Sequence, residues 1–80
     1  MVIQVIGPGC KNCKALMANV EIALNRSQIK ATVDYVTDLE AIANSGVMRT
    51  PGLIIDGVVI SQGKVLAPIE IEAFLNANEH

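Results

Sequence analysis

The chain has 80 residues, of which 51% are apolar and only two are aromatic, and its net charge is −2. This length predicts one domain over residues 1–80, and the apolar content excludes a disordered chain. The acidic balance and the scarcity of aromatic rings argue against a nucleic-acid partner. We expect no membrane association and a cytoplasmic location, because the chain lacks an apolar run of about 18 residues and a signal-peptide pattern at its start.

The first third of the chain predicts a strand, a helix and a second strand. Val2–Ile6 is an apolar run that ends in Gly-Pro-Gly at 7–9, which is typical of a strand covered on both faces. Apolar residues then recur every three or four positions over about 11–25, which predicts an amphipathic helix. Residues 31–36 alternate, which predicts a strand at or near a sheet edge. Together these elements form a βαβ unit with parallel strands.

A short helix is expected next. Thr37 and Glu40 have the spacing of a capping box, which predicts that the helix begins after Thr37. We expect its buried face to be a short apolar stripe of Leu39, Ile42 and Ala43.

The last third predicts a hairpin and a final helix. Two β-branched runs, 53–55 and 58–60, flank Asp56-Gly57, a pair that favours a type I′ turn. Pro68 suits the first turn of a helix, whose buried stripe we expect to be Ile71, Phe74 and Leu75. The whole order predicts a small α/β fold with helices on both faces of the sheet.

The two cysteines, Cys10 and Cys13, provide the main indication of chemistry. Cys10 follows a turn and begins a helix, where unpaired backbone N–H groups and the helix dipole stabilise a thiolate. We therefore expect the pKa of Cys10 to lie below the usual value of about 8.5. Lys11 and Lys14 add positive charge nearby.

The spacing of the cysteines assigns a role to each. Cys10 is expected to face solvent, whereas Cys13 shares the apolar face of the helix with Leu16 and Met17. An exposed thiolate at Cys10 would attack a substrate disulfide, and the shielded Cys13 would then resolve the mixed disulfide. A Cys-x-x-Cys pair that follows a strand and opens a helix in a βαβ unit predicts a thiol–disulfide oxidoreductase.

At this point the chain resembles the thioredoxin superfamily, and more narrowly the small thioredoxin-like, glutaredoxin-like proteins called redox-active disulfide protein 2. The resemblance rests on Gly-Pro-Gly-Cys-Lys-Asn-Cys at 7–13, on Thr50-Pro51, and on the hairpin at 55–57 followed by Gly63. It implies a four-stranded mixed sheet in the order 2-1-3-4. For the oxidoreductase we expect protein or small-molecule disulfide substrates, electrons from a flavoprotein reductase or a small-thiol pool, a monomer, and no organic cofactor or metal.

The resemblance further implies a cis peptide bond between Thr50 and Pro51, beside the cysteine pair, and a substrate-docking role for these two residues. Lys11, Lys14 and Arg49 are auxiliary candidates, and Lys11 and Arg49 have the charge to hold the carboxylates of glutathione. The alternative interpretation of each is a solvated surface charge.

Two other classes of function stay open at the level of sequence. The same two thiols suit a soft metal such as Cu(I), whereas a closed zinc site needs more ligands than Cys10, Cys13 and a distant His80 supply. A ferredoxin-like metal carrier would end on a strand, but residues 68–75 predict a helix. A non-catalytic redox-sensing adaptor would keep its function when Cys10 is replaced by Ser.

Overall fold

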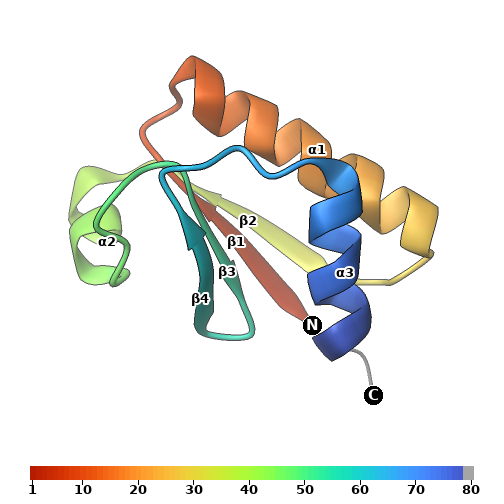
Figure 1. The fold of residues 1–80 in the computed structure, drawn as a ribbon. Coiled ribbons are helices and arrows are strands. Elements are labelled where there is room, and N and C mark those ends of the chain that lie inside the picture. Colours follow the sequence, from red (N-terminus) through yellow and green to blue (C-terminus); the bar gives the residue numbers. More distant parts are fainter. Residues whose placement is uncertain (79–80) are drawn as a thin grey trace.

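The computed structural model describes residues 1–78, which form four strands and three helices in the order predicted from the sequence (Figure 1). His80, considered above as a metal ligand, lies outside the described residues. The elements in chain order are β1 (Val2–Ile6), α1 (Lys11–Ser27), β2 (Thr32–Val36), α2 (Leu39–Asn44), β3 (Gly52–Ile55), β4 (Val58–Gln62) and α3 (Pro68–Asn78).

The four strands form one mixed sheet in the order β2-β1-β3-β4, which confirms the predicted thioredoxin-like topology. β1 is parallel to the edge strand β2 and antiparallel to β3, which continues into β4 through a tight turn. Both turn residues have positive φ, 48° at Asp56 and 83° at Gly57, as a type I′ turn requires.

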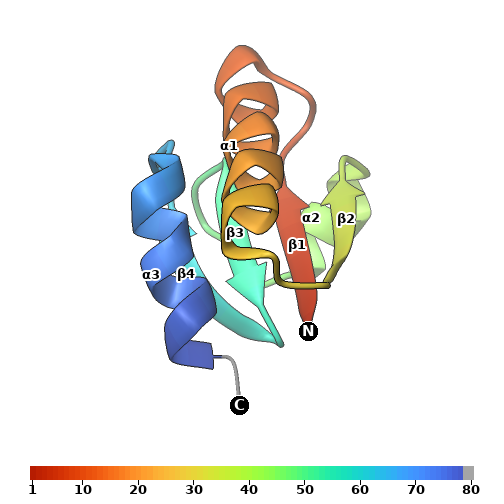
Figure 2. The same cartoon turned by 90° about the vertical axis from the view of Figure 1, so that its right-hand side faces the viewer.

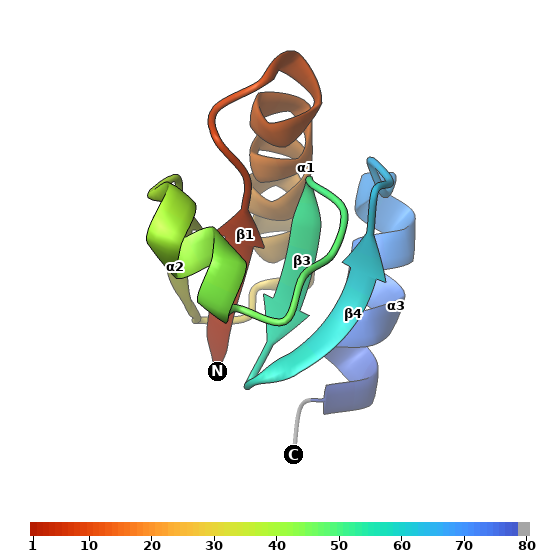
Figure 3. The ribbon, with the colours of Figure 1, turned by 90° about the vertical axis from the view of Figure 1, so that its left-hand side faces the viewer.

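Helices α1 and α3 cover one face of the sheet (Figure 2), and α2 lies on the other face (Figure 3). The larger core lies under α1 and α3, where burial of aliphatic side chains supplies the main stabilisation. Its fully buried members include Ile3, Val5, Leu16, Val20, Leu53, Ile55, Ile71 and Leu75. A smaller cluster of Ile6, Val47 and Ile54 lies on the α2 face, with Ile42 packed against it.

The predicted start of the second helix was wrong by one residue. The N-cap of α2 is Asp38, whose carboxylate accepts a hydrogen bond from Ala41 N–H at 3.0 Å, and not Thr37. The predicted stripe was also wrong in part, because Leu39 is 74% exposed and Ala43 is exposed. A helix of six residues has fewer than two turns, so only Ile42 reaches the sheet.

The final element is a helix that begins at Pro68, as predicted, and not the terminal strand of a ferredoxin-like metal carrier. Ile71 and Leu75 are fully buried, but Phe74 is 37% exposed and lies at the flank of the stripe. Within residues 1–78, no helix has both the length and the apolar character needed to cross a membrane.

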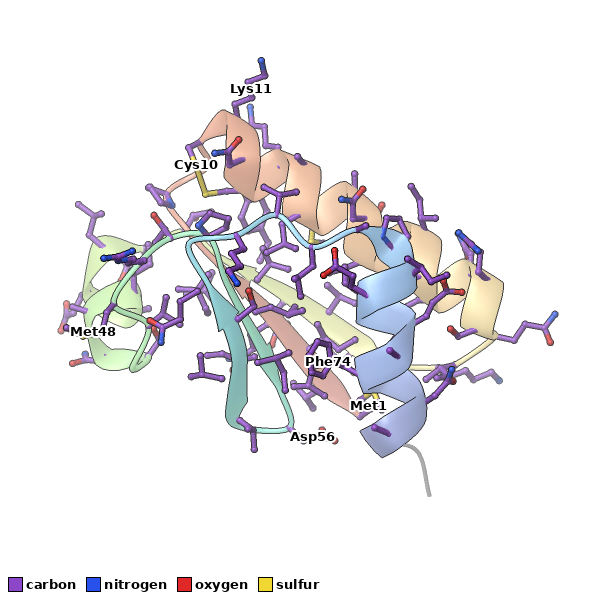
Figure 4. The ribbon with its side chains drawn as sticks, viewed as in Figure 1. Met1, Cys10, Lys11, Met48, Asp56 and Phe74 are labelled. Carbon is purple, nitrogen blue, oxygen red and sulfur yellow. A yellow bond between two sulfur atoms is a disulfide. The ribbon has the colours of Figure 1, made fainter. Side chains whose placement is uncertain are left out.

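The loops around the cysteine pair all lie at one end of the strands. Ile6 pairs with Val36 on one side and with Gly52 on the other, and Gly52 pairs with Gln62. The segments 7–10, 48–51 and 63–64 all adjoin these four strand ends. We call this end of the sheet the cysteine edge, because Cys10 lies on it (Figure 4).

Candidate active site

Cys10 and Cys13 form a disulfide at the start of α1, with their Cα atoms 5.0 Å apart. Cys10 is exposed, whereas Cys13 is completely buried and belongs to the apolar face of the helix. The sequence predicted this difference in exposure, and the structure confirms it. One sulfur of the pair is therefore open to solvent while the other is shielded by the core.

Cys10 is also the N-cap of α1. Its backbone is extended, with φ −69° and ψ 168°, and its sulfur accepts a hydrogen bond from Cys13 N–H at 3.3 Å. A cap of this kind is usually Ser, Thr, Asp or Asn, so the sulfur occupies the position of an oxygen acceptor. Among the residues of α1, all of which are described, no acidic side chain lies in the first turn. The sulfur thus lies at the positive end of the helix dipole.

Gly7 connects the cysteine pair to the loop before β3. It is buried, and a Cβ atom on it would overlap the Cys13 sulfur and lie 3.7 Å from the Cβ of Thr50. Its N–H donates to the Val36 carbonyl at 2.9 Å, which fixes the backbone at this point. The sequence pattern placed Gly7 in a turn and gave it no further role. Its position directly after the buried strand β1 was the one indication that the backbone is closely packed here.

The peptide bond between Thr50 and Pro51 is cis, as the family resemblance implied. Thr50 is exposed and Pro51 is buried. Gly63 N–H donates to both the Arg49 carbonyl, at 3.2 Å, and the Pro51 carbonyl, at 2.9 Å. The structure therefore brings the Thr50-Pro51 segment beside Gly7 and Cys13 and anchors it to the end of β4.

Gln62 supplies a second anchor for this loop, which sequence analysis missed. Its Oε1 atom accepts a hydrogen bond from Met48 N–H at 2.6 Å. Nothing in the sequence pattern links positions 14 residues apart in this way. The Met48 side chain is 87% exposed, so the contact with Gln62 is made by the Met48 backbone alone.

Lys11, Lys14 and Arg49 are all exposed at the cysteine edge. Lys11 extends into solvent beside Cys10 (Figure 4). In the described part of the chain, none of the three has an ion-pair partner; the ion pair found there joins Arg26 and Glu72 at 3.5 Å. Their positive charge is therefore available to an approaching molecule.

Only the Cys10 half of the disulfide is open to solvent, because Cys13 is buried. A pocket of about 410 Å³ lies between β4 and α3, lined by Val59, Ile60, Ser61, Gln62, Lys64, Leu66, Glu70 and Phe74. Neither cysteine lines this pocket; the Cys10 sulfur is instead reached from the exposed start of α1. Within residues 1–78, no group of three or more His, Cys, Asp or Glu side chains could hold a metal ion; in the reduced protein, the two cysteine thiols would suit a soft metal.

Comparison with known proteins agrees with this geometry. The thioredoxin-domain family matches residues 1–76. A thioredoxin of Methanothermobacter thermautotrophicus is 33% identical over 76 residues, covering 95% of this chain and 99% of that protein. A thioredoxin of Methanocaldococcus jannaschii is 35% identical over 77 residues, covering 96% of this chain and 88% of that protein. The chain belongs to the thioredoxin family and is a thiol–disulfide oxidoreductase.

Proposed function

We propose that Cys10 and Cys13 are the redox pair of this oxidoreductase, with Cys10 as the nucleophile and Cys13 as the resolving thiol. The observation that carries the proposal is the exposed Cys10 sulfur at the N-cap of α1, disulfide-bonded to the buried Cys13. In the reduced protein, a hydrogen bond from the Cys13 N–H and the helix dipole would both stabilise the Cys10 thiolate.

The reaction then has two exchange steps. The Cys10 thiolate attacks one sulfur of a substrate disulfide, the substrate S–S bond breaks, and the other substrate sulfur leaves as a thiolate that takes up a proton. Cys13, deprotonated, attacks the Cys10 sulfur of the mixed disulfide and releases the second substrate sulfur. Two electrons pass to the substrate, and the protein is left with the Cys10–Cys13 disulfide.

Thr50 and Pro51 are the proposed docking residues. Support comes from their position: Thr50 is exposed beside Gly7, and the loop is held by Gly63 and Gln62. An extended substrate chain laid along this loop would present its disulfide to Cys10. Lys11, Lys14 and Arg49 are proposed as auxiliary charges around the same site.

Protein or small-molecule disulfides are the proposed substrates, and a flavoprotein reductase or a small-thiol pool is the proposed electron donor. We further propose that residues 1–80 act as a single domain and as a monomer in the cytoplasm, with no bound metal or organic cofactor. Members of the thioredoxin family in general act on disulfides and are re-reduced by a partner.

Replacement of each cysteine tests the assignment. The reduced Cys10→Ser variant should form no mixed disulfide with a disulfide-bonded peptide, whereas Cys13→Ser should form a stable one that is detected by mass spectrometry. Each variant is the matched control of the other. A stable adduct on Cys10→Ser, or retained catalytic turnover in either variant, would contradict the assigned roles.

A further inference from the structure

We propose, on the basis of the function proposed above, that this protein prefers disulfide partners whose reacting disulfide is flanked by acidic residues. The feature responsible is a set of four exposed cations at the cysteine edge, Lys11, Lys14, Arg49 and Lys64, which we call the basic rim.

Two members of the basic rim lie on α1. Lys11 is the first residue of the helix and Lys14 lies one turn further on, directly after Cys13. Lys14 N–H donates to the Cys10 carbonyl at 3.0 Å, so the residue belongs to the same helical turn as the exposed sulfur. Figure 4 shows the Lys11 side chain pointing into solvent above Cys10.

The other two members lie across the site. Arg49 directly precedes Thr50 in the proposed docking loop. Lys64 follows Gly63, whose N–H bonds to the Arg49 carbonyl and whose Cα lies so close that an added Cβ would be 3.2 Å from the Cβ of Arg49. Lys64 therefore adjoins the same loop, so two of the four cations lie in the first turn after Cys10 and two lie in or beside the proposed docking loop.

The basic rim contrasts with the charge of the chain as a whole. It holds four of the six basic side chains, which leaves two basic against eight acidic residues for the rest of the sequence. Of those two, Arg26 lies in the last turn of α1, where it pairs with Glu72, and Lys30 lies in the loop that follows the helix. The positive charge is thus concentrated at the reactive end of a chain that is acidic overall.

Two acidic residues at the starts of α2 and α3 form local hydrogen bonds, and one of them, Glu70, lines the same pocket as Lys64. The Asp38 carboxylate caps α2 through Ala41 N–H, and Glu70 accepts from Ala67 N–H at 3.1 Å. Glu40 lies in the first turn of α2, on the opposite face of the sheet from α1. Within residues 1–78, the four rim cations have no ion-pair partner at the edge.

An incoming acidic segment would supply the missing counter-charges. Complementary charge raises the rate of encounter by steering the partner before contact, and it discriminates against partners of the same sign. Because the rim is exposed, salt should screen the effect: the Debye length is about 10 Å at 0.1 M ionic strength and about 3 Å at 1 M.

Two synthetic peptides test the proposal directly. Each contains the same internal disulfide, flanked by Glu residues in one and by Lys residues in the other, and the second-order rate of reduction by the reduced protein is measured for both. The Glu peptide should react at least about 10-fold faster at low ionic strength, and the two rates should converge at about 1 M salt.

A matched pair of variants locates the effect. Lys64→Gln should lower the rate with the Glu peptide about two- to three-fold at low salt, as expected for one exposed charge, whereas Lys30→Gln, in the loop beyond the far end of α1, should not. Lys64 is chosen because it is not on the helix that carries Cys10. Equal rates for the two peptides at low salt would overturn the preference while leaving the proposed function intact. Failure to reduce either peptide would overturn the proposed function and the preference together.

Discussion

The Cα atom of Gly7 lies directly against the sulfur of Cys13, with no room between them for a methyl group. Both residues are buried, and the Gly7 N–H is bonded to the Val36 carbonyl, so neither side of the contact can move freely. The end of β1 thus fixes the position of the Cys13 sulfur, which we propose as the resolving thiol. A substitution at Gly7 therefore tests whether catalysis depends on the position of the Cys13 sulfur against the end of β1.

Gly7→Ala should lower the free energy of unfolding by about 1–3 kcal/mol, the range for overpacking a buried site. It should also slow the resolving step, because the Cys13 sulfur is displaced from Cys10. The stability is measured by urea denaturation, and the mixed disulfide with a peptide should accumulate during turnover.

A double-mutant cycle separates the contact from other effects of the substitution. In a Cys13→Ala background the sulfur is absent, so Gly7→Ala should cost clearly less stability than it does in the native chain. An equal cost in both backgrounds would mean that the overlap with the sulfur is not the cause.

Gln62→Leu should weaken protein-disulfide reduction several-fold by releasing the docking loop at Met48 N–H. The reaction of Cys10 with a small alkylating reagent should be unchanged, because the loop takes no part in it. Gln62→Glu keeps an acceptor oxygen and should restore most of the rate. Equal loss in both variants would show that the hydrogen bond does not position the loop.

The pH dependence of Cys10 reactivity tests the thiolate argument. In the reduced Cys13→Ser variant, the alkylation rate should rise with pH as the thiolate forms, with a midpoint below the ordinary value of about 8.5. Lys11→Gln combined with Lys14→Gln should raise the midpoint, because loss of positive charge disfavours the thiolate. Lys30→Gln serves as the control, and a midpoint at or above about 8.5 in the parent variant would refute stabilisation by the helix.

The cap of α2 offers a comparison between neighbouring residues. Asp38→Ala should cost about 0.5–2 kcal/mol of stability, because the carboxylate satisfies Ala41 N–H. Thr37→Ala, one position earlier, should cost much less. Thermal or urea denaturation of both variants decides the matter, and the reverse order would restore the capping box expected from the sequence.

The elements that carry strong local signals could be predicted from the sequence. β1, α1 and the β3–β4 hairpin follow from a continuous apolar run, a helical period and an Asp-Gly turn. The exposure of Cys10 and the burial of Cys13 followed from their spacing on the helix. These features can be predicted because they depend mainly on residues close together in the sequence.

Features that depend on contacts between distant segments could not be predicted in this way. The bond from Met48 to Gln62 and the packing of Gly7 on Cys13 arise only when the strand ends meet at one edge. The prediction of a buried stripe on α2 was wrong for a related reason. The helix has only six residues and packs on the sheet through Ile42, so the spacing of its apolar residues does not show which of them are buried. The cis bond at Pro51 came from family resemblance, since most X-Pro bonds are trans.

The redox equilibrium of the cysteine pair tests the central claim most directly. Metal-free protein is equilibrated in a series of thiol/disulfide buffers, free thiols are trapped, and the products are weighed. We predict a reversible intramolecular couple between Cys10 and Cys13, with a potential between about −300 and −120 mV. Thiols that stay reduced across that range, or that form only disulfides between chains, would contradict the claim.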